Sequence, residues 1–158
     1  MLIKDLIPTD FMNYKVPAMF VAFPYCSFKC EKDCGIKCCQ NSMLARSANI
    51  EISAERIVEI YKKNSNLSKA IVLGGLEPLD SFADVIDLIA EFRKEFSDTV
   101  VIYTGYTEEE AAIYIEALQK FSNIIVKFGR FVPDQPPHVD EILGVKLMNP
   151  GQYAKKIS

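Results

Sequence analysis

The chain has 158 residues, of which 49% are hydrophobic and 25% charged, and this is the usual composition and size of one globular domain with a substantial core. A formal net charge of −3, without any run of Lys or Arg, argues against a nucleic-acid-binding surface. No apolar run approaches the roughly 20 residues of a membrane span, and residues 1–11 lack the apolar segment of a secretory signal. We therefore expect a single domain over residues 1–158, located in the cytoplasm and without membrane association.

Four short, predominantly apolar runs are the first structural signal along the chain. Runs of this length and composition are typical of strands that are buried on both faces of a parallel sheet. They cover residues 18–23, 69–73, 99–103 and 123–128. Pro24, Gly74 and Gly129 follow three of the runs and stop them.

Helical patterns separate these runs. Ser53 is a suitable N-cap for a helix over residues 54–63. Asp80 or Ser81 caps a second helix, and Thr107 with Glu110 forms a capping box for a third, which we expect to end near Phe121. The remaining predicted elements are a short strand or irregular arm over residues 1–16, a short helix over 42–48 and a last short strand over 142–147.

This alternation predicts an α/β fold. Strand and helix at this spacing form right-handed βαβ units with a mainly parallel sheet. Four to six strands are too few for a closed eight-stranded barrel, so we expect a partial (open) βα barrel. Ligands of such sheets gather at the carboxyl ends of the strands. The segments expected to meet there are 26–41, 74–78, 104–106 and 129–131.

Residues 26–41 contain all five cysteines: Cys26, Cys30, Cys34, Cys38 and Cys39. Thiolates are soft ligands that favour iron–sulfur clusters, zinc or copper(I). Charged residues between the cysteines exclude a buried core strand, and an odd, clustered count fits a reducing compartment better than a disulfide framework. A metal centre is the leading interpretation. A four-cysteine zinc site and a redox pair of cysteines are the alternatives.

Cys26 and Cys30 are separated by three residues and directly follow the first long strand. At this point the chain resembles the radical S-adenosylmethionine (SAM) superfamily, whose cysteine loop has gaps of three and then two residues. It is most similar to the short activating enzymes of anaerobic ribonucleotide reductase. Those chains carry comparable segments after their later strands and near the C-terminus, which here read Gly74–Leu79, Tyr103–Tyr106, Gly129–Phe131 and Asn149–Gln152.

The second gap of the cysteine loop departs from this family. We favour Cys39 as the third ligand because Cys39-Gln40-Asn41 resembles the Cys-x-Asn that closes the family's loop. Residues 31–38 are then an insertion. Cys34 is the second candidate and Cys38 the third. The family's aromatic residue before the last cysteine is absent, which affects how the adenine would be covered there.

The resemblance implies a set of cofactor-binding residues. Cys26, Cys30 and Cys39 would hold a 4Fe–4S cluster whose fourth iron is chelated by SAM. Other residues would bind SAM itself: Gly74, Gly75 and Glu77 its amino group, Thr104 and Tyr106 its ribose or carboxylate, and Arg130 a carboxylate or the adenine. Without the resemblance, the two glycines would be explained by a tight turn, Glu77 by a solvent-facing position before a helix, Thr104 and Tyr106 by a satisfied turn, and Arg130 by a surface salt bridge.

The function implied by the resemblance is that of an oxidoreductase. A reduced flavodoxin or ferredoxin would supply one electron, SAM would be cleaved to a 5′-deoxyadenosyl radical, and the radical would take a hydrogen from a glycine of a partner. The partner would be a glycyl radical enzyme, the large subunit of an anaerobic ribonucleoside-triphosphate reductase. The alternatives are a radical SAM enzyme that modifies another peptide or small molecule, and a non-catalytic iron–sulfur or zinc carrier protein.

Overall fold

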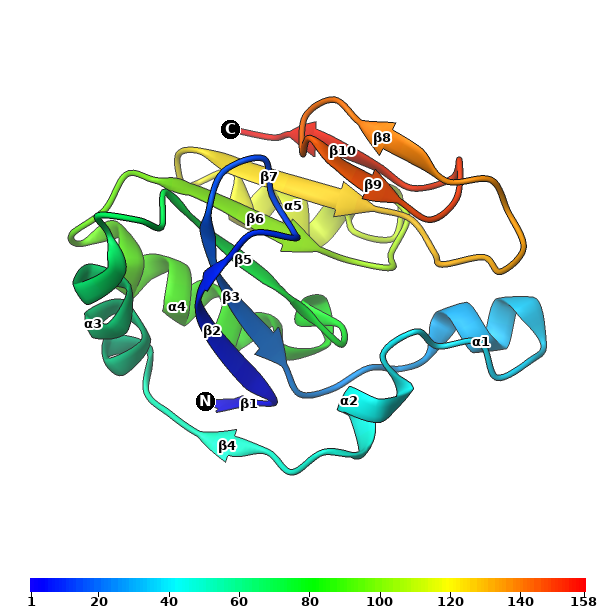
Figure 1. The fold of residues 1–158 in the computed structure, drawn as a ribbon, viewed down its shortest axis with the longest axis horizontal. Helices are drawn as coiled ribbons and strands as arrows, with labels where there is room; N and C mark the ends of the chain where they lie inside the picture. Colours follow the sequence, from blue (N-terminus) through cyan, green and yellow to red (C-terminus); the bar gives the residue numbers. More distant parts are fainter.

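The computed structural model describes residues 1–158 and has a mixed α/β architecture around a six-stranded sheet (Figure 1). The strand order is β10-β7-β6-β5-β3-β2. The four central strands are parallel to one another: β3 (Ala18–Phe23), β5 (Ala70–Gly75), β6 (Thr99–Tyr103) and β7 (Ile124–Phe128). The two edge strands, β2 (Asp5–Asp10) and β10 (Tyr153–Lys156), pair antiparallel with their neighbours.

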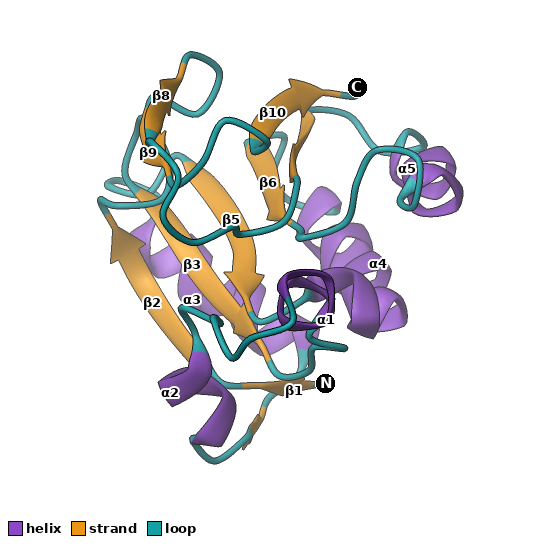
Figure 2. Cartoon of the chain, turned by 90° about the vertical axis from the view of Figure 1, so that its right-hand side faces the viewer, coloured by secondary structure: helices purple, strands orange, loops and turns teal.

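Three helices connect the parallel strands and lie on one face of the sheet (Figure 2). They are α3 (Ala54–Asn64), α4 (Phe82–Arg93) and α5 (Ala112–Leu118). A short 3-10 helix, η1 (Pro78–Ser81), leads into α4. Two further short helices, α1 (Lys29–Cys34) and α2 (Ser42–Arg46), follow β3 within and after the cysteine-rich segment. No helix has both the length and the apolar character that crossing a membrane requires.

The main core lies between the sheet and these three helices. The register aligns core residues across all four parallel strands, so that each row forms a continuous apolar ridge. One row is Met19, Ile71, Val100 and Ile124, and the next is Val21, Leu73, Ile102 and Val126. All eight side chains are essentially inaccessible to solvent. Burial on this scale fixes the strand register because a slip by one residue would move the rows to the opposite face.

A smaller apolar cluster covers part of the opposite face. The hairpin of β8 (His138–Asp140) and β9 (Val145–Leu147) contributes to it, as does Tyr14 from the β2–β3 connection. Leu143 and Leu147 pack there against Val72 and Val101 of the sheet. A last two-stranded element joins β1 (Leu2–Ile3) to β4 (Ile50–Glu51).

The predicted strands and two of the three predicted caps agree with this structure. The cap predicted for α4 is wrong: Ser81 stands at the N-cap position without a side-chain hydrogen bond, and the Asp80 carboxylate accepts from the N–H of Ser27 and the hydroxyl of Tyr106. The side chain of Ser53 accepts a hydrogen bond from the backbone N–H of Arg56, as an N-cap does. Thr107 and Glu110 exchange both bonds of the capping box, but regular α-helix begins only at Ala112, because residues 108–111 form turns.

Several short elements were missed or misplaced, among them β4, β8 and η1, which the sequence did not predict. The strand predicted over residues 142–147 is shorter, because the Asp140 carboxylate accepts bonds from the N–H groups of Ile142 and Leu143 and holds a turn there. It also pairs with β8 and not with the main sheet. Helix α1 and strand β10 were not predicted.

Candidate cluster and cofactor site

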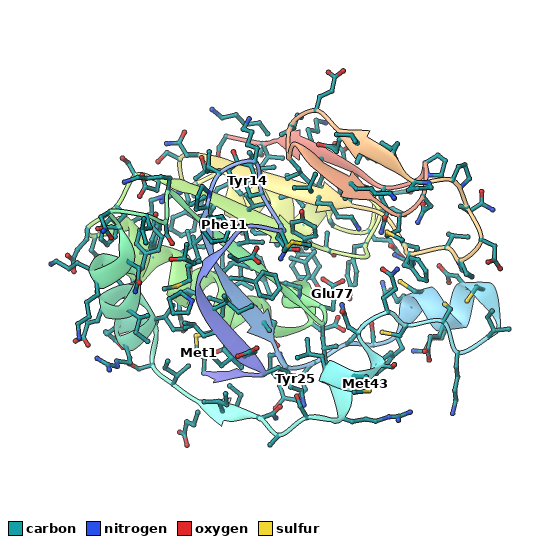
Figure 3. The ribbon with its side chains drawn as sticks, viewed as in Figure 1. Met1, Phe11, Tyr14, Tyr25, Met43 and Glu77 are labelled. Atoms are coloured by element: carbon teal, nitrogen blue, oxygen red, sulfur yellow. The ribbon has the colours of Figure 1, made fainter.

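One cavity of about 370 Å³ lies where the parallel strands end. Figure 1 shows β3 and β7 pointing toward the side of the molecule that carries α1, and Figure 3 shows Glu77 between these strand ends and the cysteine-rich segment. The four segments expected to meet at this edge do meet here. Residues lining the cavity include Cys26, Cys30, Cys39, Gly74, Gly75, Glu77, Thr104, Gly105, Lys127 and Gly129.

Three of the five cysteines line this cavity and two do not. Cys26, Cys30 and Cys39 face it, whereas the thiols of Cys34 and Cys38 contact each other, with their Sγ atoms 2.9 Å apart. The structure thus separates the cysteines into the set favoured by the resemblance and a second pair.

Local hydrogen bonds hold the three cavity cysteines. The backbone N–H of Phe28 donates to the Sγ of Cys26 at 3.2 Å, at the point where α1 begins. Cys30 lies in the first turn of α1, and the carboxylate of Glu31 accepts from the N–H of Cys39 at 3.1 Å. The same helix therefore carries one cysteine of the set and anchors another.

The protonation of these thiols depends on burial. Burial, together with the nearby carboxylates of Glu77 and Asp80, raises the pKa of Cys26 to about 11, and the hydrogen bond from the N–H of Phe28 opposes this shift. Burial also raises the pKa of Cys39. A positive ion or cluster is needed to displace the protons, because only the thiolate is a ligand.

No three His, Cys, Asp or Glu side chains lie close enough together to hold one metal ion. Ligands of a four-iron cluster bind separate irons at its corners and so do not share one ion.

Glu77 is the most enclosed acidic group of the cavity, with 4% of its surface exposed. Its Oε1 accepts from the Thr104 hydroxyl at 2.7 Å and from the N–H of Leu79 at 3.1 Å, and its Oε2 accepts from the N–H of Gly105 at 2.8 Å. Burial raises its pKa, and the three donors oppose this effect. Each carboxylate oxygen can accept two bonds, so Oε2 keeps one free position.

Thr104 and Tyr106 differ in their relation to the cavity. Thr104 lines it, but its hydroxyl donates to Glu77 and accepts from the N–H of Tyr106. The Tyr106 hydroxyl donates to Asp80 at 2.6 Å, and its ring lies beneath the ammonium of Lys29, 3.7 Å from the ring centroid. Tyr106 does not line the cavity.

Arg130 forms ion pairs beside the cavity and does not line it. Its guanidinium binds both carboxylate oxygens of Glu110 at 2.7 Å, and its Nε donates to Asp33 of α1 at 2.7 Å. Lys29 of α1 also pairs with Glu110. Arg130 and Lys29 lower the pKa of Glu110 together with the capping N–H of Thr107. We call Arg130, Glu110, Asp33 and Lys29 the α1 clasp, since they join that helix to the segments after β6 and β7.

The sequence reasoning missed Lys127. The sequence contained a usable signal, because Lys127 lies within an otherwise apolar run that predicts a buried strand. A buried lysine is rare and usually has a partner or a function. The side chain lines the cavity with 6% of its surface exposed, and its ammonium donates to the carbonyl of Gly129 at 2.9 Å. Burial lowers its pKa to about 8. Two of its three donors have no protein acceptor.

Asn41 also contributes to the cavity wall. Its side-chain amide donates to the carbonyl of Gly75 at 2.5 Å and so ties the end of the cysteine-rich segment to the end of β5.

Comparison with known proteins gives one family. A family model described as a 4Fe-4S single cluster domain matches residues 17–146, which include the cysteine-rich segment and all four parallel strands. No curated protein matches the chain significantly.

Proposed function

The chain belongs to the family of 4Fe–4S single cluster domains, and from this premise we propose that it is a radical SAM enzyme. It is an iron–sulfur protein. The proposal adds that SAM binds beside the cluster and is cleaved reductively, and that the six-stranded sheet is the partial βα barrel of this enzyme class. The observation that carries it is the meeting of three cysteines, a buried lysine and a buried glutamate at one cavity.

The donor set fits a cluster with one open iron. Cys26, Cys30 and Cys39 line the cavity, and three thiolates leave one corner of a cubane without a protein ligand. The remaining two cysteines pair with each other, away from the cavity. The hydrogen bond from the backbone N–H of Phe28 to the Sγ of Cys26 would also stabilise the Cys26 thiolate.

The rest of the cavity fits the charged methionyl end of SAM. Lys127 offers two spare ammonium donors to a carboxylate. The free position on Glu77 Oε2 and the glycine backbone at Gly74 and Gly75 suit an amino group. Burial of both charged residues makes each interaction stronger than it would be in water.

Cys26, Cys30 and Cys39 would hold the cluster, which would supply the one-electron chemistry for reductive cleavage of SAM to methionine and a 5′-deoxyadenosyl radical. The protein's part is to bind, orient and shield. Lys127 and Glu77 orient the two ends of the amino acid group, and the α1 clasp holds α1, which carries Cys30, beside the cavity.

The cavity has the size of a site for a small ligand, and SAM beside a cluster would fill most of it. The hydrogen donor would therefore approach from outside, as the surface of a partner protein. We propose a glycyl radical enzyme as this partner, with the large subunit of an anaerobic ribonucleoside-triphosphate reductase as the first candidate, and a reduced flavodoxin or ferredoxin as the electron donor.

The test is anaerobic reconstitution, reduction with dithionite and addition of SAM. We expect 5′-deoxyadenosine and methionine in equal amounts, and their loss in Cys30→Ala. A fully loaded cluster that forms no 5′-deoxyadenosine would contradict the proposal and favour an electron carrier. A glycyl radical signal on an added reductase, measured by electron paramagnetic resonance, would then separate an activating enzyme from one that modifies another substrate.

A further inference from the structure

Two cysteines of the insertion are left over once the cavity is lined. Cys34 and Cys38 are both half-buried, and their Sγ atoms lie 2.9 Å apart. A disulfide bond is about 2.05 Å long, so less than 1 Å of movement separates the two thiols from bonding distance. Neither lines the cavity.

The local chain path explains why they meet. Cys34 is the last residue of α1, and Gly35 ends the helix in the left-handed conformation at φ 72°, its N–H donating to the carbonyl of Glu31. This reversal brings Cys38 back over the helix end. The Cys34 thiol also lies within 3.4 Å of the Ile36 carbonyl, so the contacts that hold the pair are all within the insertion.

We propose that Cys34 and Cys38 form a reversible thiol–disulfide site, distinct from the cluster ligands. The oxidant is a low-molecular-weight disulfide, RSSR. One thiolate attacks it and releases RS⁻, and the second thiolate attacks the mixed disulfide and releases the other RS⁻. The pair loses two electrons and two protons, and the oxidant leaves as two RSH.

This bond changes what the insertion offers to iron. In the disulfide, neither sulfur is a thiolate, so neither can replace Cys39 as a ligand. The bridge also ties the end of α1 to the residue next to Cys39. The inference rests on the proposed function only in assigning Cys26, Cys30 and Cys39 to the cluster.

Peptide mapping of the full-length, cluster-loaded protein tests the proposal. The protein is treated anaerobically with glutathione disulfide, free thiols are blocked with N-ethylmaleimide, and the chain is digested with trypsin. Lys32 and Lys37 place Cys34 on one peptide and Cys38 on the next, so a bond between them links two fragments. We expect this linked product in the oxidised sample and its loss after dithiothreitol, with the iron content unchanged.

Cys34→Ser and Cys38→Ser are the matched controls, and we expect each to keep its iron and to lose the linked product. Absence of the link in the unmodified chain, or fragmentation that places it on Cys39, would overturn the proposal. So would loss of iron from either Ser variant, because that cysteine would then be a ligand. The mapping does not use SAM, so failure to form 5′-deoxyadenosine would count against the proposed function alone.

Discussion

Two oppositely charged residues, Glu77 and Lys127, are buried at the same cavity. Each loses hydration on folding, which is costly unless other groups replace the water. Glu77 has three protein donors, whereas Lys127 has one protein acceptor. Glu77 is therefore largely satisfied by the fold itself, and Lys127 has the greater unused binding capacity.

The first prediction concerns Lys127 and pH in the cluster-free chain. Its folded pKa of about 8 lies below the ordinary value of 10.5, so burial of the ammonium destabilises the fold at neutral pH. The unfolded chain holds the proton up to about pH 10.5, and the folded chain releases it near pH 8. Lys127 therefore makes the free energy of unfolding rise between these pH values, by on the order of 3 kcal/mol.

Lys127→Met should remove this rise in denaturant titrations between pH 7 and 10. The same variant should weaken SAM binding to the loaded protein by at least tenfold, measured by equilibrium dialysis. A variant that binds SAM as well as the parent would show that Lys127 does not hold the carboxylate.

The second prediction concerns Glu77. In Glu77→Gln, an NH₂ group replaces one of the two carboxylate oxygens and cannot accept a hydrogen bond. The variant therefore loses either the bond from the N–H of Gly105 or the bonds from Thr104 and Leu79. Leaving buried donors unpaired costs about 1–3 kcal/mol. We expect a loss of this size in the free energy of unfolding, together with weaker SAM binding.

Glu116→Gln is the matched control for Glu77→Gln, since Glu116 is exposed on α5. Its unfolding midpoint should equal that of the parent. Equal midpoints for both variants would show that the Glu77 hydrogen bonds contribute no net stability.

At the level of elements, α1 depends on the α1 clasp for its position. None of its residues is buried, so core packing does not fix it. Its charged contacts run to Glu110 and Arg130 instead. A single exposed ion pair contributes about 0–1 kcal/mol to stability. Here the bidentate Arg130–Glu110 pair also binds Asp33 and Lys29 of α1, so the four charges form one network.

Glu110→Gln should therefore loosen α1 and speed the release of iron to a chelator by about threefold to tenfold. Glu108→Gln is the control, because it breaks a comparable surface pair with Lys155 that does not touch α1. Both variants should keep the parent's spectrum before the chelator is added. Identical release rates for the two variants would show that the clasp does not restrain the cluster segment.

The clasp also predicts a pH dependence. The pKa of Glu110 is lowered in the fold, so its contribution is fully present above the ordinary carboxyl pKa of 4.5 and is lost as the pH falls below it. The difference in iron release between parent and Glu110→Gln should accordingly shrink in acid.

At the level of the whole molecule, the C-terminal segment completes the cavity edge. Strand β10 pairs with β7, and Gln152 lines the cavity. Gly129, which follows β7 at φ 98°, lies directly against Gly151: an added Cβ would come within 3.1 Å of the carbonyl carbon of Gly151 and closer still to its oxygen. This contact joins the end of the fourth parallel strand to the C-terminal segment.

Gly129→Ala should therefore destabilise the protein by on the order of 3 kcal/mol, as backbone strain adds to overpacking. Gly35→Ala is the control, since Gly35 also has a positive φ but no atom within 4 Å of an added Cβ. It should cost about 1–2 kcal/mol. Equal losses in the free energy of unfolding, measured by chemical denaturation, would show that the C-terminal segment moves away from the added methyl group without destabilising the protein.

Local sequence features determined much of this protein. The four parallel strands follow from apolar runs that only a doubly covered sheet can bury, and the Ser53 cap and the Thr107–Glu110 box from hydrogen bonds within one turn. Clustered cysteines predicted a metal centre, and the resemblance of their segment to a known family predicted an iron–sulfur cluster, which the family match supports. In each case the groups that interact, or that share one ligand, lie close together in the chain.

The tertiary structure decided the features that depend on residues far apart in the sequence. Strand β10 has the sequence Tyr-Ala-Lys-Lys, which is no apolar run, and it gains its place from backbone pairing with β7. Lys127 is buried at the cavity, where segments far apart in the sequence meet. The separation of Cys39 from Cys34 and Cys38 likewise depends on which thiols face the cavity. The spacing of residues along the chain could not predict the pairing of β10, the burial of Lys127 or the separation of the cysteines. The path of the chain in space decides which of these groups are desolvated together and which remain in water.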